Sequence, residues 1–145
     1  MASRNRASAK KAGATFERKI ADHLAISLDD DRVDRRVKTG AKDRGDIAGV
    51  RTIRGGRVVL ECKDYGGQYQ VTPWLREAET ERGNDDAIIG AVIAKRRGIA
   101  DPGQQVVMMT VDTFINLLQG GGDVPYTVVD DPTVATAELP ESIIG

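Results

Sequence analysis

The pattern of apolar and polar positions along the chain predicts eight secondary-structure elements in the order helix, three strands, helix, two strands, helix. The first helix is indicated by Phe16, Ile20 and Leu24, which recur on one helical face. The strands are short runs rich in β-branched residues and bounded by turn-forming residues. The expected ranges are a helix at 14–28, strands at 33–37, 46–53 and 57–65, a helix at 73–83, strands at 87–97 and 104–111, and a helix at 113–119.

This order predicts a single α/β domain over residues 14–119. A chain of 145 residues is long enough to bury roughly 68–70% of its unfolded surface, so a self-sufficient core is expected. Residues 1–13 are basic and lack apolar periodicity, which predicts a flexible N-terminal arm. Three glycines at 120–122 end the pattern, and we expect residues 120–145 to form an acidic, extended tail.

Charge is distributed unevenly along the chain, although the formal net charge is only −1. All 21 Lys and Arg lie in residues 1–97, whereas residues 98–145 contain seven acidic residues and no Lys or Arg. A basic body indicates a polyanionic partner such as DNA. The alternative is a solvated surface of mixed charge followed by an acidic tail, and charge alone does not separate the two.

Localisation is predicted from three features of the composition. No apolar run approaches the ~18 residues of a membrane span, and no signal-peptide core follows the basic N-terminus. Cys62 is the one cysteine, so neither an internal disulfide nor a cysteine-based zinc cluster can form. We therefore expect a cytoplasmic protein with no membrane partner.

Glu61 and Lys63 are unusual because they lie in an otherwise apolar strand, RVVLECKDY. Side chains two apart on a strand share a face, so this pair points one way while Leu60 and Cys62 point toward the core. Charges inside a sheet are costly unless further groups neutralise them. Asp46, at the start of the preceding strand, is the best candidate for such a group.

The register of the predicted hairpin decides whether Asp46 reaches Glu61. In a hairpin with a two-glycine loop, Asp46 would share the face of Glu61 but lie about 13 Å from the position opposite it, at ~3.3 Å per residue. We therefore expect one of two departures. Either the loop is wider and shifts the register by an even number of residues, or a β-bulge intervenes, with Gly49 as its candidate position.

Two carboxylates and a lysine on neighbouring strands suit Mg²⁺ or Mn²⁺, because both ions prefer oxygen ligands. Glu17 borders the apolar face of the first helix and is a further candidate. Such an ion polarises a phosphoryl oxygen and lowers the pKa of a bound water, while Lys63 offsets the charge that develops on phosphorus. The alternative is that Glu61 and Lys63 form an exposed ion pair worth ~0–1 kcal/mol.

The chain resembles the PD-(D/E)XK nuclease superfamily in three segments: FERKIADHLA with Glu17, GDIAGV with Asp46, and VVLECK with Glu61 and Lys63. Its archaeal-type Holliday junction resolvase branch, also found among phage proteins, is particularly similar. The resemblance covers residues 13–118. It implies a restriction-endonuclease-like core with a central mixed sheet flanked by helices. It also implies a metal-dependent, structure-selective DNA endonuclease that acts as a homodimer on four-way junctions.

The resemblance further implies roles for individual residues. Asp46 and Glu61 would bind Mg²⁺ or Mn²⁺, and Lys63 would assist the attacking water. Glu17 would support the metal or its water. The chain departs from the name-giving motif at Gly45, where that motif has proline. A duplex-cleaving restriction or repair nuclease of the same fold, and a non-catalytic DNA-binding protein, are the alternatives.

Basic residues flank the predicted site. Eight of them are expected to contact DNA phosphates: Arg35, Arg36, Lys38, Lys42, Arg44, Lys95, Arg96 and Arg97. The chain has no zinc-finger, basic-zipper or RNA-recognition signature, which favours recognition of DNA shape over base sequence. Trp74 and Tyr69 are candidates for stacking on an exposed base, and Trp74 is alternatively an anchor of the core.

Overall fold

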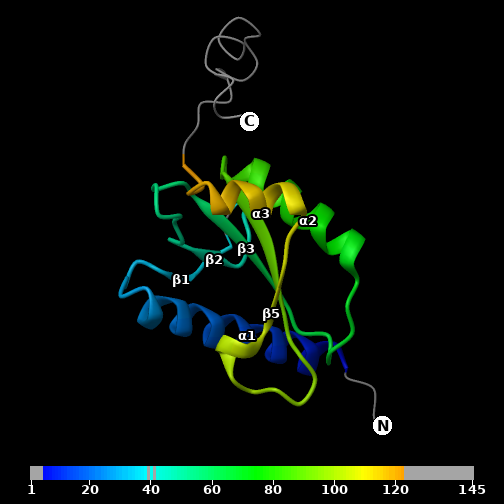
Figure 1. Ribbon diagram of the computed structural model, residues 1–145. Coiled ribbons are helices and arrows are strands. Elements are labelled where there is room, and N and C mark those ends of the chain that lie inside the picture. The colour runs from blue at the N-terminus through cyan, green and yellow to red at the C-terminus, as the bar shows by residue number, and fades with distance from the viewer. Residues whose placement is uncertain (1–4, 39, 41, 123–145) are drawn as a thin grey trace, which may run out of the picture.

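A computed structural model describes residues 5–38, 40 and 42–122 of the protein, and three α-helices and five strands make up this part (Figure 1). The elements are α1 (Arg6–Ser27), β1 (Asp34–Arg35), β2 (Ile47–Ala48), β3 (Val58–Lys63), α2 (Val71–Asn84), β4 (Ile89–Ala94), the 3₁₀ helix η1 (Pro102–Gln104), β5 (Val106–Met108) and α3 (Val111–Leu118). The predicted α/β class and element order are confirmed. The expected acidic tail falls almost entirely on residues 123–145, which lie outside the described residues.

Helix α1 begins at Arg6, so the prediction of a flexible arm over residues 1–13 is wrong for residues 6–13. Asn5 caps the helix, because its side-chain Oδ1 accepts a hydrogen bond from the backbone N–H of Ser8 at 2.8 Å. Residues 6–13 have no apolar face, but they are rich in alanine, lysine and arginine, which are good helix formers. They therefore extend a helix that packing stabilises farther along the chain.

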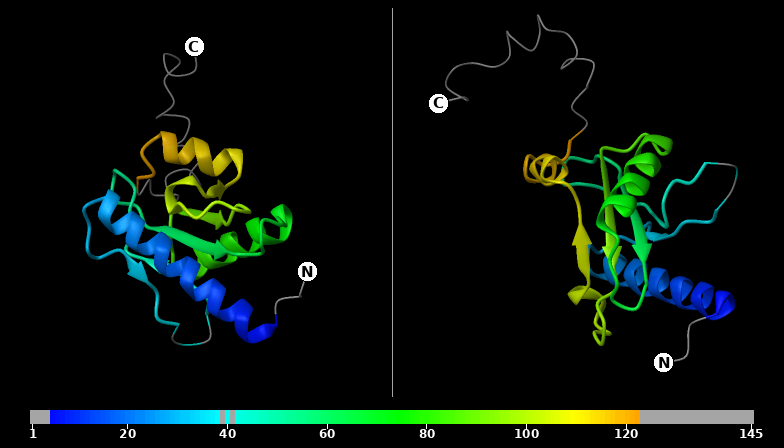
Figure 2. Two further views of the ribbon diagram at one scale, coloured as in Figure 1. Left: turned by 90° about the horizontal axis from the view of Figure 1, so that it is seen from below. Right: turned by 90° about the vertical axis from the view of Figure 1, so that its right-hand side faces the viewer.

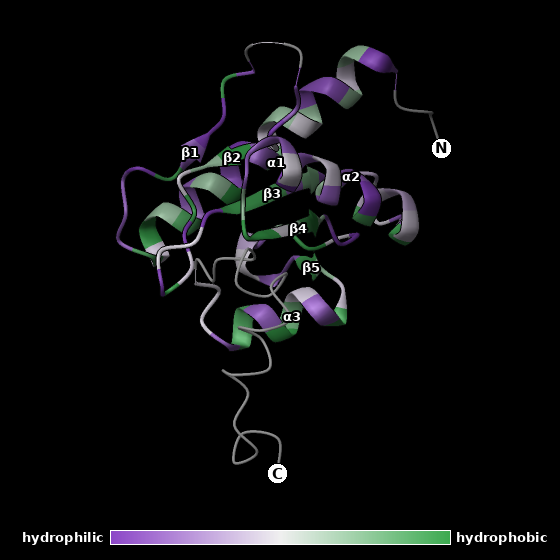
Figure 3. Ribbon diagram, turned by 90° about the horizontal axis from the view of Figure 1, so that it is seen from above, coloured by the Kyte–Doolittle hydropathy of each residue, from purple (hydrophilic) through white to green (hydrophobic). Residues whose placement is uncertain are grey.

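The five strands form one mixed sheet in the order β1-β2-β3-β4-β5. β3 and β4 are parallel and are connected through α2, whereas the other neighbouring pairs are antiparallel. Helix α1 packs on one face, where Phe16 joins a cluster with Leu60. Helix α2 packs on the opposite face, where Trp74 joins a cluster with Val92 (Figure 2). The central strand β4 is largely hydrophobic (Figure 3), and so is β3 apart from Glu61 and Lys63.

The hairpin between β2 and β3 combines the two departures that were expected as alternatives. The wider loop alone shifts the register by three residues, from Arg54 to Arg51 opposite Arg57, and the bulge adds the residue that makes the shift even. Arg51 pairs with Arg57, so the loop has five residues. Farther from the loop, Ile47 pairs with Leu60. Between these two pairs the β2 side has one residue more than the β3 side, which is a β-bulge. Gly49, with a φ of 86°, lies within it.

The wider loop and the bulge together bring Asp46 opposite Glu61. The backbone N–H of Asp46 donates to the carbonyl oxygen of Leu60 at 2.9 Å. The Asp46 carboxylate accepts a hydrogen bond from the backbone N–H of Cys62 at 2.8 Å. Asp46 is thus held between the two neighbours of Glu61 on β3, so the two carboxylates come from directly facing positions.

Helix α3 crosses one end of the sheet, across the top of the view in Figure 1. It exposes apolar side chains, among them Val111, Phe114 and Leu118, which are 73%, 48% and 70% exposed. Neither this helix nor another in the described ranges combines the length and apolar character needed to span a membrane.

Candidate active site

Asp46 is a buried carboxylate, 3% exposed, that lies directly before β2. Its Oδ2 accepts the Cys62 N–H, and its Oδ1 lies 3.5 Å from the Nζ of Lys38. Burial raises the pKa of Asp46, and the negative charge of Glu17 adds to this shift. The hydrogen bond from Cys62 and the charge of Lys38 oppose it without cancelling it. The hydrogen bond from Cys62 fixes the orientation of the Asp46 carboxylate, and its contact with Lys38 places it beside the basic segment before β2.

Gly45 explains why the residue before Asp46 is not proline. Its φ is 90°, whereas the proline ring restricts φ to about −65°. Its backbone N–H also donates to Oδ1 of Asp43 at 2.9 Å, and proline has no such donor. The departure from the name-giving motif is therefore a requirement of this backbone, and it leaves Asp46 facing Glu61.

Glu61 and Lys63 are 6% and 9% exposed, so the predicted alternative of an exposed ion pair is wrong. The Nζ of Lys63 lies 3.4 Å from Oε1 of Glu61 and also forms an ion pair with Glu77 of α2. Burial by itself lowers the pKa of Lys63, but its contacts with Glu77 and Glu61 outweigh burial and raise the pKa. The ammonium group therefore stays charged at neutral pH.

Glu81 of α2 is a third buried carboxylate that is not among the residues predicted from sequence. It is 1% exposed, and in the described residues no N–H or hydroxyl group donates to either of its carboxylate oxygens. Its carboxyl group lies within hydrogen-bonding reach of Glu61, but two carboxylates form such a bond only if one of them is protonated. Oε2 of Glu61 is likewise buried and unpartnered. A signal was present in the sequence, because Trp74, Ala78 and Glu81 follow one another at helical spacing on the buried face of α2.

The side chains of Asp43, Glu61 and Glu81 converge. One carboxylate oxygen from each lies within 4.8 Å of the other two. Burial raises the pKa of Glu61 to about 7. Burial, together with the adjoining Glu61, raises the pKa of Glu81 further above its ordinary value. Because the donors are all oxygen and several are buried without a partner, the residues present fit a divalent ion such as Mg²⁺ or Mn²⁺.

The metal-free protein is expected to lose stability as pH rises. Burial raises the pKa of Glu61 from 4.5 to about 7, so its stabilising contribution is fully present below the unfolded value and is lost as pH rises to the folded value. The raised pKa of Glu81 changes stability in the same direction and extends the loss of stability to higher pH. In the presence of a chelator, the unfolding temperature should fall from about pH 5 to about pH 8. Glu81→Gln should flatten this profile, and a rise with pH in the parent protein would contradict the expectation.

Glu17 lies on α1, which packs against the face of the sheet opposite to Glu61. Arg35 donates two hydrogen bonds to Oε2 of Glu17, from Nε at 3.0 Å and from Nη2 at 2.8 Å. The charge of Glu17 nevertheless contributes to the raised pKa of Asp46. Glu17 therefore lies close enough to Asp46 to act on it electrostatically, but it is outside the group formed with Glu81.

The basic residues before β2 gather around two hollows. Arg35, Arg36 and Lys38 line a groove of about 550 Å³ between α1 and β1. Lys42 and Arg44 line a smaller pocket of about 190 Å³, together with Arg36 and Lys38. These five predicted DNA contacts therefore lie together beside Asp46 and Glu17.

The basic residues 95–97 follow β4, whose end lies beside the end of β3. Their side chains donate to backbone carbonyls of neighbouring segments: Lys95 to Arg96 at 2.7 Å, Arg96 to Gln104 at 3.2 Å and Arg97 to Gly66 at 3.1 Å. They shape the loops at the Lys63 end of the sheet and leave part of their charge exposed there.

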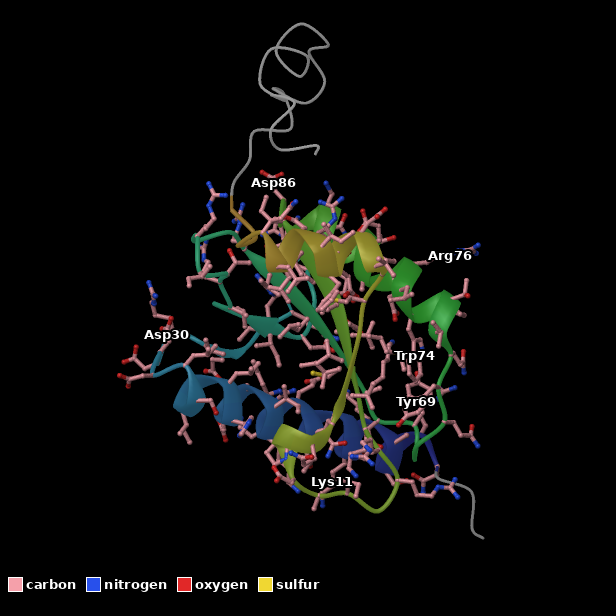
Figure 4. The ribbon with its side chains drawn as sticks, viewed as in Figure 1. Lys11, Asp30, Tyr69, Trp74, Arg76 and Asp86 are labelled. Carbon is pink, nitrogen blue, oxygen red and sulfur yellow. The ribbon has the colours of Figure 1, made fainter. Side chains whose placement is uncertain are left out.

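Trp74 is an anchor of the core, at 4% exposed. Its ring centroid lies 5.2 Å from that of Tyr65 and 6.4 Å from that of Tyr69, the latter in an edge-on arrangement (Figure 4). Tyr69 is 43% exposed. Of the two aromatic residues considered for base stacking, Tyr69 is the accessible one.

Comparisons with known proteins identify no relative: no family model matches the chain, and no curated protein or solved structure shows significant similarity to it. The function must therefore be argued from the geometry of the site.

Proposed function

We propose that the protein is a metal-dependent DNA endonuclease with a restriction-endonuclease-like core. The observation that supports this most directly is the position of Asp46 opposite Glu61, with Lys63 next on the same buried face of β3. Burying these three charged groups is costly for stability. Two carboxylates and an ammonium group on adjacent strands are, by contrast, well suited to hydrolysing a phosphodiester with a bound divalent ion.

In the proposed site, Asp46 and Glu61 would hold Mg²⁺ or Mn²⁺, and the bound ion would supply Lewis acidity to the phosphodiester. Lys63 has a defined position because Glu61 and Glu77 both contact its ammonium group. It donates a hydrogen bond to the attacking water and offsets the negative charge that develops on phosphorus. Glu17 keeps Arg35 in place near Asp46, where that cation attracts the DNA backbone.

DNA phosphates are proposed to lie along the groove between α1 and β1. Arg36 and Lys38 line this groove, and Lys42 and Arg44 extend the basic surface toward Asp43. Each phosphate that these residues neutralise adds to the salt dependence of binding. Recognition of DNA shape is favoured because backbone contacts carry no base sequence information.

A four-way junction is the proposed substrate, and a homodimer is the proposed active form. One chain provides one such site, whereas symmetric resolution of a junction requires two cuts.

The test compares a labelled four-way junction with a duplex of matched sequence, in Mg²⁺ and in EDTA. The parent protein should cleave the junction only with Mg²⁺. Asp46→Asn and Glu61→Gln should each slow cleavage at least about 10²-fold, since a lost ligand removes several kcal/mol of charge stabilisation. Glu79→Gln, which changes an exposed carboxylate on α2, is the matched control and should cleave normally.

Each other outcome points to a different protein. Cleavage in EDTA, or full activity in both carboxylate variants, would contradict the mechanism. Equal cleavage of the duplex would indicate a restriction or repair nuclease of the same fold. DNA binding that survives Glu61→Gln, with no cleavage by the parent protein, would indicate a non-catalytic DNA-binding protein.

A further inference from the structure

Glu81 is the buried charged group that the proposed reaction leaves unexplained. It is 1% exposed, and within the described residues its two oxygens receive no hydrogen bond from an N–H or hydroxyl group and form no ion pair with Lys or Arg. The group within hydrogen-bonding reach is the carboxyl of Glu61, which repels an ionised Glu81 unless a proton or a cation lies between them. An ionised carboxylate in such a position costs several kcal/mol. A neutralising partner is therefore required, and the two possibilities are a proton and a metal cation.

The neighbouring carboxylates provide the geometry for a cation. One oxygen each from Asp43, Glu61 and Glu81 lies within 4.8 Å of the others. Two ligands of one ion lie at most twice the metal–oxygen distance apart, about 4.2 Å for Mg²⁺ and about 4.6–5.2 Å for Ca²⁺. Three evenly spaced ligands lie closer together, at most about 1.7 times the metal–oxygen distance apart, which is about 4.0–4.5 Å for Ca²⁺ and about 3.6 Å for Mg²⁺. The three oxygens therefore reach a common ion after an inward movement of their side chains, which is smallest for Ca²⁺.

The loop that carries Asp43 is tied to the helix that carries Glu81. Asn84, at the end of α2, donates from Nδ2 to the backbone carbonyl of Asp43 at 2.7 Å. The Asp43 carboxylate is oriented by the N–H of Gly45 at 2.9 Å. Asp43 is exposed, whereas Glu61 and Glu81 are buried. The group thus has two buried inner ligands and an outer ligand on the solvent side, where water can complete the coordination.

We infer that Asp43, Glu61 and Glu81 form a divalent-cation site that shares Glu61 with the proposed catalytic pair and binds its ion in the absence of DNA. The ligand class is a hard divalent ion, Mg²⁺, Mn²⁺ or Ca²⁺. The inference rests on the proposed function only for the use of the ion in cleavage, because binding itself requires no DNA. Glu81 is the ligand that distinguishes this site from the pair formed by Asp46 and Glu61.

The competing explanation is a proton shared between Glu61 and Glu81. Glutamine at position 81 separates the two, because its amide has the shape and the hydrogen-bond donor of a protonated glutamate but not the charge of a metal ligand. A shared proton predicts that Glu81→Gln leaves metal binding unchanged. A cation site predicts that Glu81→Gln weakens it.

The experiment titrates the full-length, DNA-free protein with Mn²⁺ and follows free Mn²⁺ by electron paramagnetic resonance. The parent protein should bind the ion, and Glu81→Gln should weaken binding at least about tenfold, since even outer-shell changes cost about 10–100-fold. Glu79→Gln removes one charge from the exposed side of α2 and should bind like the parent. Asp43→Asn, at an exposed position, provides a second variant that should weaken binding without disturbing the core. Circular dichroism confirms that each variant is folded.

The results separate this site from the proposed function. Failure of the parent protein to bind Mn²⁺ in the millimolar range, or equal binding by Glu81→Gln and Glu79→Gln, would overturn the inference. Asp46→Asn should retain Mn²⁺ at this site while it loses cleavage. Binding by a parent protein that cleaves no DNA would leave the site standing and reject the nuclease. Normal cleavage by the parent protein, together with Mn²⁺ binding that Glu81→Gln does not weaken, would reject the site and leave the nuclease standing.

Discussion

Replacing Lys63 with methionine is expected to slow cleavage of junction DNA by about 10²–10³-fold and to leave DNA affinity nearly unchanged. The ammonium group of Lys63 is buried and is held by Glu61 at 3.4 Å and by Glu77. A charge that is already oriented in a site of low water content stabilises the charge that develops in the transition state far more than it stabilises bound DNA. Methionine retains the unbranched apolar stem, so packing in β3 is largely preserved. Single-turnover cleavage with saturating protein measures the rate separately from binding.

Arg51→Met is the matched control for this experiment. Arg51 is an exposed cation at the loop end of the hairpin, where it pairs with Arg57, and Lys63 is at the other end of β3. The control removes one positive charge from the same sheet and should cleave at nearly the parental rate. Parental rates in Lys63→Met would exclude the lysine from the reaction. Equal slowing in both variants would attribute the effect to the overall attraction of DNA.

Gly49→Ala is expected to lower the free energy of unfolding by about 2–5 kcal/mol. Gly49 has a φ of 86°, which costs an alanine about 1–2 kcal/mol. Its Cβ would also lie 2.3 Å from the backbone carbonyl oxygen of Arg32, an atom that cannot rotate aside as a side chain can. Relief of that clash requires a shift of the chain leading into β1, with a cost of the size seen for overpacked cores, about 1–3 kcal/mol. Urea denaturation followed by circular dichroism measures the loss.

Gly55→Ala separates the clash from the backbone conformation. Gly55 has a φ of 89°, but a Cβ there would meet no atom within 4 Å. This variant should therefore lose only the conformational part, about 1–2 kcal/mol. Equal losses in the two variants would show that contact with Arg32 does not constrain the bulge. A larger loss for Gly49→Ala, accompanied by slower cleavage, would link the bulge to the position of Asp46.

The relation between Asp46 and Glu61 shows how far local rules reach. Alternation along a strand is a property of the backbone, so the shared face of Glu61 and Lys63 was predictable from their spacing. The rise per residue of a strand also excluded a simple two-glycine hairpin, because that hairpin would leave Asp46 about 13 Å from the position opposite Glu61. The structure contains both a wider loop and a bulge at Gly49. Propensity did not indicate their combination, because both features involve segments outside the hairpin. Thr52 in the loop donates to the carbonyl oxygen of Gly121, and Gly49 in the bulge lies against the backbone of Arg32.

Two features of the helices were not predicted, for different reasons. The start of α1 at Arg6 was missed because residues 6–13 have no apolar periodicity, and capping and helix propensity hold them in the helix instead. Glu81 was missed because no buried face was assigned to the helix expected at 73–83. Its spacing from Trp74 and Ala78 placed it on the buried face, and a carboxylate in that position is seldom buried without a partner.

By itself, the sequence determined the order of the elements, the α/β class and the face on which Glu61 and Lys63 project, because each follows from local periodicity. Only the tertiary structure decided which carboxylates meet. Glu81 reaches Glu61 because α2 packs across β3, and Asp43 joins them because its loop is bonded to the end of that helix. Contacts between residues so far apart in the chain depend on packing and register, which no local pattern specifies.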